Sequence, residues 1–279
     1  MAAVAMLSHV LRAERWRMLL APSKNHVSLG NSFLSLMIGY LVNLAVPRGG
    51  EVSRCYNLYK LEKTPVEVSF GTVVVERIVD VLCLLVLIVL SFVMEWDRLR
   101  DFIATLPIGS ASAGMQIPLW AYVALAALVA IAVAVYLLRK NEKLRQVLAG
   151  FKEGLLSVFR LEHKSLFVGY SLLIWTLYFV MSYLVIKAFP ETATLGTSAV
   201  MTLFAVGAIA MAVPLPGGAG SYHTLVPMAL VALYQMNKAD AVAFVFIFHA
   251  WQTLIMIVGG LISLLISYFL IRWKRAQPK

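Results

Sequence analysis

Three charged residues lie close together inside an otherwise apolar stretch at 66–94. In the run GTVVVERIVDVLCLL, Glu76, Arg77 and Asp80 fall within about 100° of one another on a helix. Carboxylates and a guanidinium in this arrangement can pair with one another or bind a charged ligand. Arginine suits phosphate in particular, because its planar fork donates two parallel hydrogen bonds. On a helix that starts near residue 66, Glu76 lies about 15 Å along the axis, close to the middle of a bilayer.

Charges at this depth need partners. One ionised side chain at the bilayer centre costs about 2.5–3.5 kcal/mol, so three unpaired ones would cost on the order of 9 kcal/mol. The stretch AVPRGGEVSR supplies Arg48, Glu51 and Arg54 as candidate partners. Two interpretations follow. In one, an ion-pair network only holds the segments together; in the other, part of the network opens onto a hydrated cavity and binds a charged group.

The composition defines the class of protein that contains these residues. Hydrophobic residues make up 61% of the 279 residues and charged residues only 14%, and the mean hydropathy is +0.84. A soluble domain carries about 25% charged residues. We therefore expect an all-α, polytopic integral membrane protein of about six to eight helices, built as one domain over residues 1–279. The expected apolar segments are 66–94, 118–138, 166–188, 193–213 and 241–271.

The net charge of +10 does not indicate a nucleic-acid partner, because the basic residues lie in short loops beside apolar runs. The segment 139–164 and the C-terminal IRWKRAQPK are both basic and are expected in the cytoplasm. We therefore predict a multi-pass protein of the cell (inner or plasma) membrane with a cytoplasmic C-terminus. Two further basic groups also look cytoplasmic: Arg12, Arg15, Arg17 and Lys24, and then Arg48, Arg54, Lys60 and Lys63.

The apolar run 30–46 lies between those two groups, so a single crossing would place one of them outside. A re-entrant hairpin resolves this: 30–46 enters the membrane, turns at 47–50 and returns through 51–62. A similar break, AVPLPGGAG, follows the run 193–213, and 222–236 would return from it. The alternative is that the two breaks match by chance and both runs simply cross the membrane.

Two broken hairpins, each followed by a long helix, predict an inverted repeat with pseudo-repeats at about 30–94 and 193–271. Such repeats bind their substrates near the bilayer midplane. The glycine turn can offer backbone N–H groups to an anion, whereas His249 has the alternative role of a hydrogen-bonded packing residue. The candidate substrate-binding residues are Arg48, Glu51, Arg54, Glu76, Arg77, Asp80, Gly217, Gly218, Gly220, His223 and His249.

Other features predict less. The segment 141–164 has helical amphipathic spacing and is expected to lie on the inner membrane surface. Cys55 and Cys83 fit no disulfide or metal spacing, and no motif predicts a metal, a cofactor or catalytic residues. The opening MAAVAMLSHVL is about half a span, and we expect a helix upstream of it.

Several motifs resemble the lysylphosphatidylglycerol synthase transmembrane, or flippase-like, family. They are P-R-G-G-E-x-x-R at 47–54, G-T-V-x-x-E-R-x-x-D at 71–80, P-G-G-x-G at 216–220 and the pair Arg15–Trp16. The resemblance extends over essentially the whole chain. It implies an integral membrane domain that, in some members, moves aminoacylated phospholipid between leaflets. His223 stands where the family often has a glutamate, and the transferase half of those members has no counterpart here.

We therefore expect a membrane lipid flippase or a transporter of a phosphate-bearing, lipid-linked compound, and not an enzyme. The expected partners are membrane lipids: anionic or aminoacylated phospholipids, or polyprenyl phosphates. Arg48, Arg54 and Arg77 would bind the phosphate, and the three carboxylates would orient these arginines or bind an amine. Two alternatives remain. One is a non-catalytic scaffold or regulatory subunit of a lipid-modifying system, and the other is a membrane-embedded lipid transferase. The sequence sets no oligomeric state.

Overall fold

A computed structural model describes residues 1–105, 141–213 and 215–276. The described residues form α-helices and short 3-10 turns without a strand, which confirms the all-α prediction. The α-helices are α1 (Ala2–Leu20), α2 (Leu29–Ala45), α3 (Gly49–Glu62), α4 (Val66–Met94), α5 (Trp96–Thr105), α7 (Glu142–Leu156), α8 (Lys164–Ala188), α9 (Thr197–Ala212), α10 (Ser221–Tyr234) and α11 (Lys238–Ala276). The 3-10 turns are η1 (Ala21–Ser23), η3 (Ser157–Arg160) and η4 (Pro216–Gly218).

The described part thus contains more helices than the six to eight expected, because each hairpin arm is a separate helix and α5 and α7 are short. The expected span 118–138 lies outside the described residues.

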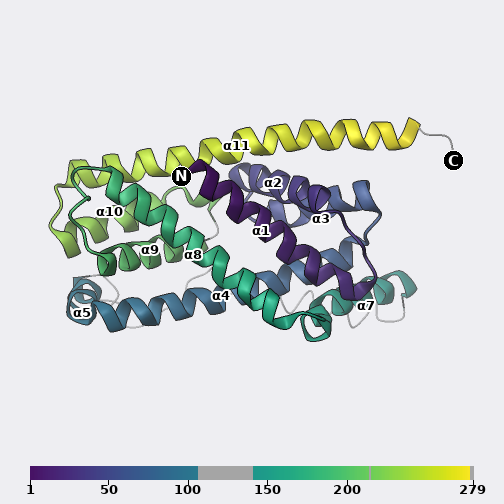
Figure 1. Cartoon of the computed structure of the whole chain (residues 1–279), viewed down its shortest axis with the longest axis horizontal. Helices are drawn as coiled ribbons and strands as arrows, with labels where there is room; N and C mark the ends of the chain where they lie inside the picture. Colours follow the sequence, from purple (N-terminus) through teal and green to yellow (C-terminus); the bar gives the residue numbers. More distant parts are fainter. Residues whose placement is uncertain (106–140, 214, 277–279) are drawn as a thin grey trace.

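Of the three long helices, α4 and α11 run roughly along the long axis of the molecule, and α8 crosses it obliquely (Figure 1). At 1.5 Å per residue, α4, α8 and α11 measure about 43, 38 and 58 Å, and about 30 Å is needed to cross the hydrocarbon core. Among the described helices, α8 and α11 are both long and apolar enough to span a membrane. The arms α2, α3, α9 and α10 are only about 21–26 Å long.

Large apolar side chains remain exposed along these long helices. Val89 and Val93 on α4 are 60% and 77% exposed, and Leu265 and Phe269 on α11 are 59% and 65% exposed. A soluble monomer does not leave such continuous apolar faces in water. These faces are suited to contact with lipid chains.

The first hairpin, α2–α3, turns because its sequence cannot continue as a helix. Pro47 removes a backbone donor, and Arg48 takes a left-handed conformation with φ of 61°. The N–H of Gly50 donates to the Asn43 Oδ1 across the turn at 2.8 Å. Gly39 and Gly50 let the two arms approach closely, because a Cβ on either glycine would meet the other's carbonyl oxygen. The predicted turn 47–50 overlaps the break between α2 and α3, which comprises residues 46–48, whereas Gly49 and Gly50 are the first residues of α3.

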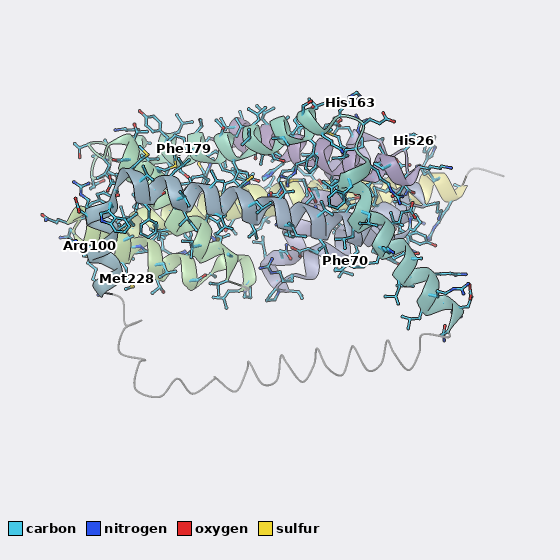
Figure 2. All side chains as sticks on the ribbon, turned by 90° about the horizontal axis from the view of Figure 1, so that it is seen from below. His26, Phe70, Arg100, His163, Phe179 and Met228 are labelled. Carbon is cyan, nitrogen blue, oxygen red and sulfur yellow. The ribbon has the colours of Figure 1, made fainter. Side chains whose placement is uncertain are left out.

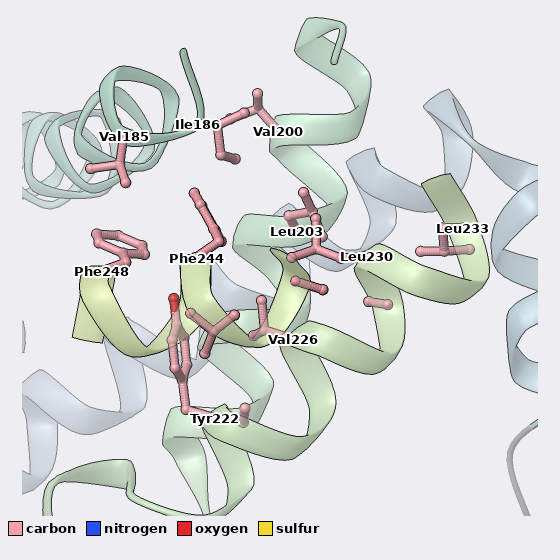
Figure 3. Close-up of a cluster of buried hydrophobic side chains, with 14 of the residues drawn as sticks. Val185, Ile186, Val200, Leu203, Tyr222, Val226, Leu230, Leu233, Phe244 and Phe248 are labelled. Atoms are coloured by element: carbon pink, nitrogen blue, oxygen red, sulfur yellow. The ribbon is translucent and has the colours of Figure 1, made fainter. Parts of the chain in front are cut away.

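The second hairpin, α9–α10, turns through three glycines with positive φ, namely Gly217, Gly218 and Gly220. A side chain at these positions would strain the backbone. The Ser221 hydroxyl at the start of α10 donates to the Ala210 carbonyl at 2.7 Å and ties the second arm to the first. Apolar side chains then pack the hairpin against α8 and α11 (Figure 3). They include Val185, Ile186, Val200, Leu203, Tyr222, Val226, Leu230, Leu233, Phe244 and Phe248.

The turns of the two hairpins meet. The hairpins lie toward opposite ends of the long axis (Figure 1). Arg48 Nη2 donates to the Ala212 carbonyl at 3.0 Å, and Leu44 lies directly beside Gly217. Each hairpin is followed by a long helix, α4 or α11. Re-entry into a membrane and an inverted repeat stay predictions.

His26, in the connection between α1 and α2, and Arg100, on α5, lie toward opposite ends of the long axis (Figure 2). The described part of the predicted external loop 95–117 contains the helix α5. Glu95, expected in that loop, is buried instead, because the hydroxyls of Ser198 and Tyr234 donate to its carboxylate.

The amphipathic segment 141–164 forms α7 and η3 and packs against the first half of α4. The contact depends on two glycines, because a Cβ on Gly154 would lie 3.0 Å from both the Gly71 Cα and the Thr72 N. Val147 and Phe159 remain exposed on this segment. Its place on a membrane surface stays a prediction.

A pair of alanine substitutions tests this helix contact. We expect Gly154→Ala to lower the melting temperature of the purified protein in detergent, because the added methyl group meets the backbone of α4. The matched change Gly169→Ala adds its methyl group to open space on α8. It should leave the melting temperature unchanged or raise it, since alanine favours a helix by about 0.5–1 kcal/mol over glycine. Equal melting temperatures for the two variants would contradict the close α4–α7 contact.

Candidate functional site

Asp80 on α4 lies at the centre of an ionic network. Its two carboxylate oxygens accept hydrogen bonds from Arg15 Nη2 and Arg12 Nη2, each at 2.8 Å. Arg12 and Arg15 are three residues apart on α1, so they share one face of that helix. Two charge-assisted hydrogen bonds of this length satisfy both oxygens of the carboxylate.

Glu76, one turn before Asp80, is fully buried. Its Oε2 pairs with Arg54 Nη2 of α3 at 2.5 Å, and its Oε1 lies 3.6 Å from Arg15 Nη2. The Arg54 guanidinium also lies 4.6 Å from the ring centre of Trp16. The Trp16 Nε1 donates to the Thr72 hydroxyl at 2.9 Å. This layer joins α1, α3 and α4 into one unit.

Arg77 occupies the outer layer of the network and is held more loosely. Its side chain is 36% exposed, and its nearest carboxylate oxygens are those of Glu51 at 3.6 Å and Asp80 at 3.8 Å. These separations exceed ordinary hydrogen-bond lengths. The Arg77 guanidinium can therefore turn toward a ligand at less cost than the buried arginines.

The structure corrects one sequence prediction. Arg12 and Arg15 were grouped with the basic residues of a cytoplasmic loop, and that was wrong, because both side chains are buried against α4. Their charge is tolerated there because Asp80 and Glu76 lie opposite. The other two members of the group, Arg17 and Lys24, are not fully buried.

A cavity of about 500 Å³ adjoins the network at the place where the two hairpin turns meet. Seven of the predicted site residues line it: Arg48, Glu51, Arg77, Asp80, Gly217, Gly218 and His249. Arg54 and Glu76 lie behind this wall and are almost completely buried. Gly220 and His223 do not belong to the wall. Both halves of the chain thus contribute to one cavity.

His249 on α11 holds the second turn in place. Its Nε2 donates to the Gly217 carbonyl at 2.9 Å. Its ring also stacks on Tyr222 with ring centres 5.4 Å apart, and the His223 ring packs edge-on against it with ring centres 4.7 Å apart. This geometry shows the packing role that the sequence analysis kept open for His249. Substrate binding by His249 stays a prediction.

A second hollow of about 470 Å³ extends from the same wall between α3 and α4. It shares Arg48, Glu51, Arg77 and Val81 with the cavity. Its remaining lining is apolar and consists of Val52, Phe70, Val73, Val74, Ile78 and Leu82. We call this hollow the α3–α4 groove. The groove has a charged end, formed by Arg48, Glu51 and Arg77, and an apolar wall that suits a hydrocarbon chain.

Sequence reasoning missed several members of the site. Arg12 and Arg15 pair with Asp80, and His9, Tyr40 and Tyr178 line the cavity beside them. One signal was present, because two arginines at i and i+3 complement the two carboxylates at i and i+4 on α4. The aromatic members carried no such signal, because apolar spacing on a helix is equally typical of packing residues.

The exposed apolar faces, the paired helical hairpins and the buried ionic network together define a polytopic helical membrane protein. Residues 1–260 match the sequence model of the family described as "Lysylphosphatidylglycerol synthase TM region", and the chain belongs to this family. The chain is also 36% identical over 77 residues to the UPF0104 membrane protein MJ1595 of Methanocaldococcus jannaschii. That match covers 26% of this chain and 23% of the relative. No solved structure matches. The resemblance found in the motifs is thus confirmed, and the family indicates a membrane-lipid-related role.

The Arg54–Glu76 pair is expected to behave as a buried ion pair. Arg54→Met should lower the free energy of unfolding by about 3–5 kcal/mol, because it removes the closest partner of a buried carboxylate. The double variant Arg54→Met, Glu76→Met keeps the net charge and should recover most of that loss. Thermal unfolding in detergent measures the stability of the single and the double variant.

The control is Arg145→Met, whose exposed pair with Glu142 on α7 should contribute less than about 1 kcal/mol. A double variant Arg54→Met, Glu76→Met that is no more stable than Arg54→Met alone would contradict the prediction for the Arg54–Glu76 pair.

Proposed function

We propose that the protein moves a phosphate-bearing lipid, or a lipid-linked compound, between membrane leaflets. The observation that carries the proposal is the cavity, lined by arginines, at the junction of the two hairpin turns, continuous with the apolar α3–α4 groove. A lipid needs both surfaces, because its headgroup is charged and its tail is not. The headgroup would pass through the cavity while the tail stays in the groove or in the bilayer.

The distances divide the arginines into two roles. Arg12, Arg15 and Arg54 are buried and lie 2.5–2.8 Å from carboxylate oxygens, so they hold the fold together. Arg48 is exposed and donates to a backbone carbonyl, and Arg77 lies 3.6 Å from its nearest carboxylate oxygen. Displacing these two arginines from their present partners costs least. They are therefore the proposed phosphate ligands.

The network also explains why the site tolerates the absence of substrate. Charged groups in a membrane interior persist when they pair with one another or contact water. Here the carboxylates pair with the arginines in advance, and only the outer arginines are left to exchange partners. When one phosphate binds, no further side chain then has to become charged inside the protein.

We further propose that the α2–α3 and α9–α10 hairpins enter the membrane from opposite faces. Their arms are shorter than the hydrocarbon core is thick, and their turns meet one another. Arg48 and Leu44 of the first hairpin contact Ala212 and Gly217 of the second, and separating the turns would break these contacts. Such a separation would open the cavity toward one face at a time, as alternating access requires. We also propose that this membrane is the cell membrane and that the C-terminus lies in the cytoplasm.

Lipid transfer in proteoliposomes tests the arginine assignment. We expect Arg77→Gln and Arg48→Gln each to slow the transfer of fluorescent phosphatidylglycerol by at least about tenfold, because each removes a charge-assisted hydrogen bond to phosphate. Arg145→Gln is the matched control on the exposed face of α7 and should transfer lipid at the wild-type rate. Wild-type rates in all three variants would refute the assignment.

Cysteine labelling separates a transporter from a scaffold. In a Cys83→Ser background, Leu44→Cys at the end of α2 and Leu215→Cys before η4 place one thiol on the cavity wall beside each turn. We expect both to react with a charged, membrane-impermeant thiol reagent, because a transport site must admit water. The native Cys55 is fully buried and serves as the unreactive control. Failure of both turns to react from either side would favour the scaffold alternative.

A further inference from the structure

The end of α3 carries two lysines, each of which lies against the ring of a tyrosine. Lys60 Nζ is 4.9 Å from the ring centre of Tyr56, and Lys63 Nζ is 5.5 Å from that of Tyr59. The two tyrosines are 53% and 38% exposed. In each pair the lysine follows its tyrosine by four residues, about one helical turn. The aromatic rings thus position two ammonium groups at the surface of the protein.

The end of α11 lies beside the end of α3 and repeats this pairing. Lys274 Nζ donates to the Leu61 carbonyl at 2.7 Å, which fixes the two helix ends side by side. The Arg272 guanidinium is 5.5 Å from the ring centre of Tyr268, and its Nη1 donates to the Tyr268 hydroxyl at 3.1 Å. Tyr268 is 51% exposed. A third cation and a third exposed tyrosine therefore lie at the same end of the molecule.

Nearby carboxylates do not neutralise these three cations. Among the described residues, Lys60, Lys63 and Arg272 form no ion pair. Glu62 lies between the two lysines in the chain, but its carboxylate is 3.9 Å from Lys274. The helix ends therefore leave a local positive charge at the surface, which attracts an anion.

The side chains next to these cations fit a phospholipid better than a soluble anion. One turn before Tyr56, Val52 is 54% exposed and lines the apolar α3–α4 groove. On α11, Leu265 and Phe269 are 59% and 65% exposed just before Arg272. Along both helices, exposed apolar side chains are followed by a tyrosine and then by a cation. This order matches the hydrocarbon, interfacial and headgroup layers of one membrane leaflet.

We propose that this end of the molecule is a docking site for the headgroup of an anionic phospholipid. The phosphate would contact Lys60, Lys63 and Arg272, and an acyl chain would lie along Val52 and the α3–α4 groove. The site is separate from the cavity, whose lining contains none of these three cations. Docking therefore uses none of the arginines assigned to lipid transfer, and it does not require the protein to move lipid.

Native mass spectrometry of the detergent-purified full chain measures the binding of phosphatidylglycerol and of zwitterionic phosphatidylcholine. An Arg77→Gln background lowers binding in the cavity. Adding Lys60→Gln, Lys63→Gln should weaken phosphatidylglycerol at least about tenfold and phosphatidylcholine little, because lysines attract an anionic headgroup. The matched pair Lys143→Gln, Lys152→Gln removes two exposed lysines of α7 and should weaken binding less than about twofold. Equal losses for the two lipids, or for the two pairs of variants, overturn the site.

Two further measurements test the parts of the site. Tyr56→Leu should weaken phosphatidylglycerol about two- to fivefold, because it removes the ring that positions Lys60, whereas Tyr56→Phe keeps the ring and should bind like the parent protein. Identical binding by both variants overturns the role of the ring. Glycerol 3-phosphate carries the phosphate without acyl chains and should displace little lipid. If it displaces phosphatidylglycerol as well as the free lipid does, the ligand is a soluble anion and the lipid assignment is overturned.

The melting temperature and the transfer assay separate docking from other roles. Lys60→Gln, Lys63→Gln should keep the melting temperature of the parent protein, because neither lysine forms an ion pair among the described residues. A lowered melting temperature assigns the lysines to the stability of the fold and overturns the docking role. Docking by a protein that transfers no lipid in proteoliposomes supports this site and overturns only the proposed transport.

Discussion

The whole structure depends on the pairing of two carboxylates on α4 with arginines from two other helices. Glu76 and Asp80 lie one turn apart and accept hydrogen bonds from α1 and α3. None of these charges could lie inside a membrane protein alone, because the cost of three or four would match the stability of a domain. Together they fix the positions of α1, α3 and α4 beside a cavity.

The hairpins and the network need each other. The turn of α2–α3 positions Arg48, Glu51 and Arg54 because the break at Pro47 and the two glycines sends α3 back along α2. The same turn meets the glycine turn of α9–α10. His249 holds this second turn in place, because its Nε2 donates to the backbone carbonyl of Gly217. Both turns thus border a cavity lined in part by polar side chains. The geometry therefore explains why the two breaks in the sequence resemble each other: both supply non-helical backbone to one cavity wall.

The family and the local elements could be predicted from the sequence to a large extent. The helix α4 has the predicted bounds 66–94, and the break between α2 and α3, at residues 46–48, overlaps the predicted turn 47–50. The prediction failed for Arg12 and Arg15 because charge counting along the chain treats a basic residue near a helix end as facing water. Nothing local distinguishes a solvated arginine from one that will pack against a carboxylate some 65 residues away. The sequence likewise does not show which residues bind a lipid, and the role of each residue in lipid binding stays a prediction.

The sequence by itself determined the class of protein, the position of its helix breaks and the presence of charges that must be paired. These follow from local chemistry, because hydropathy, proline and glycine act within a few residues of where they stand. The tertiary structure alone decided which arginine pairs with which carboxylate, which arginines remain loosely held, and that both turns line the same cavity. Those outcomes depend on how helices distant in the chain pack together.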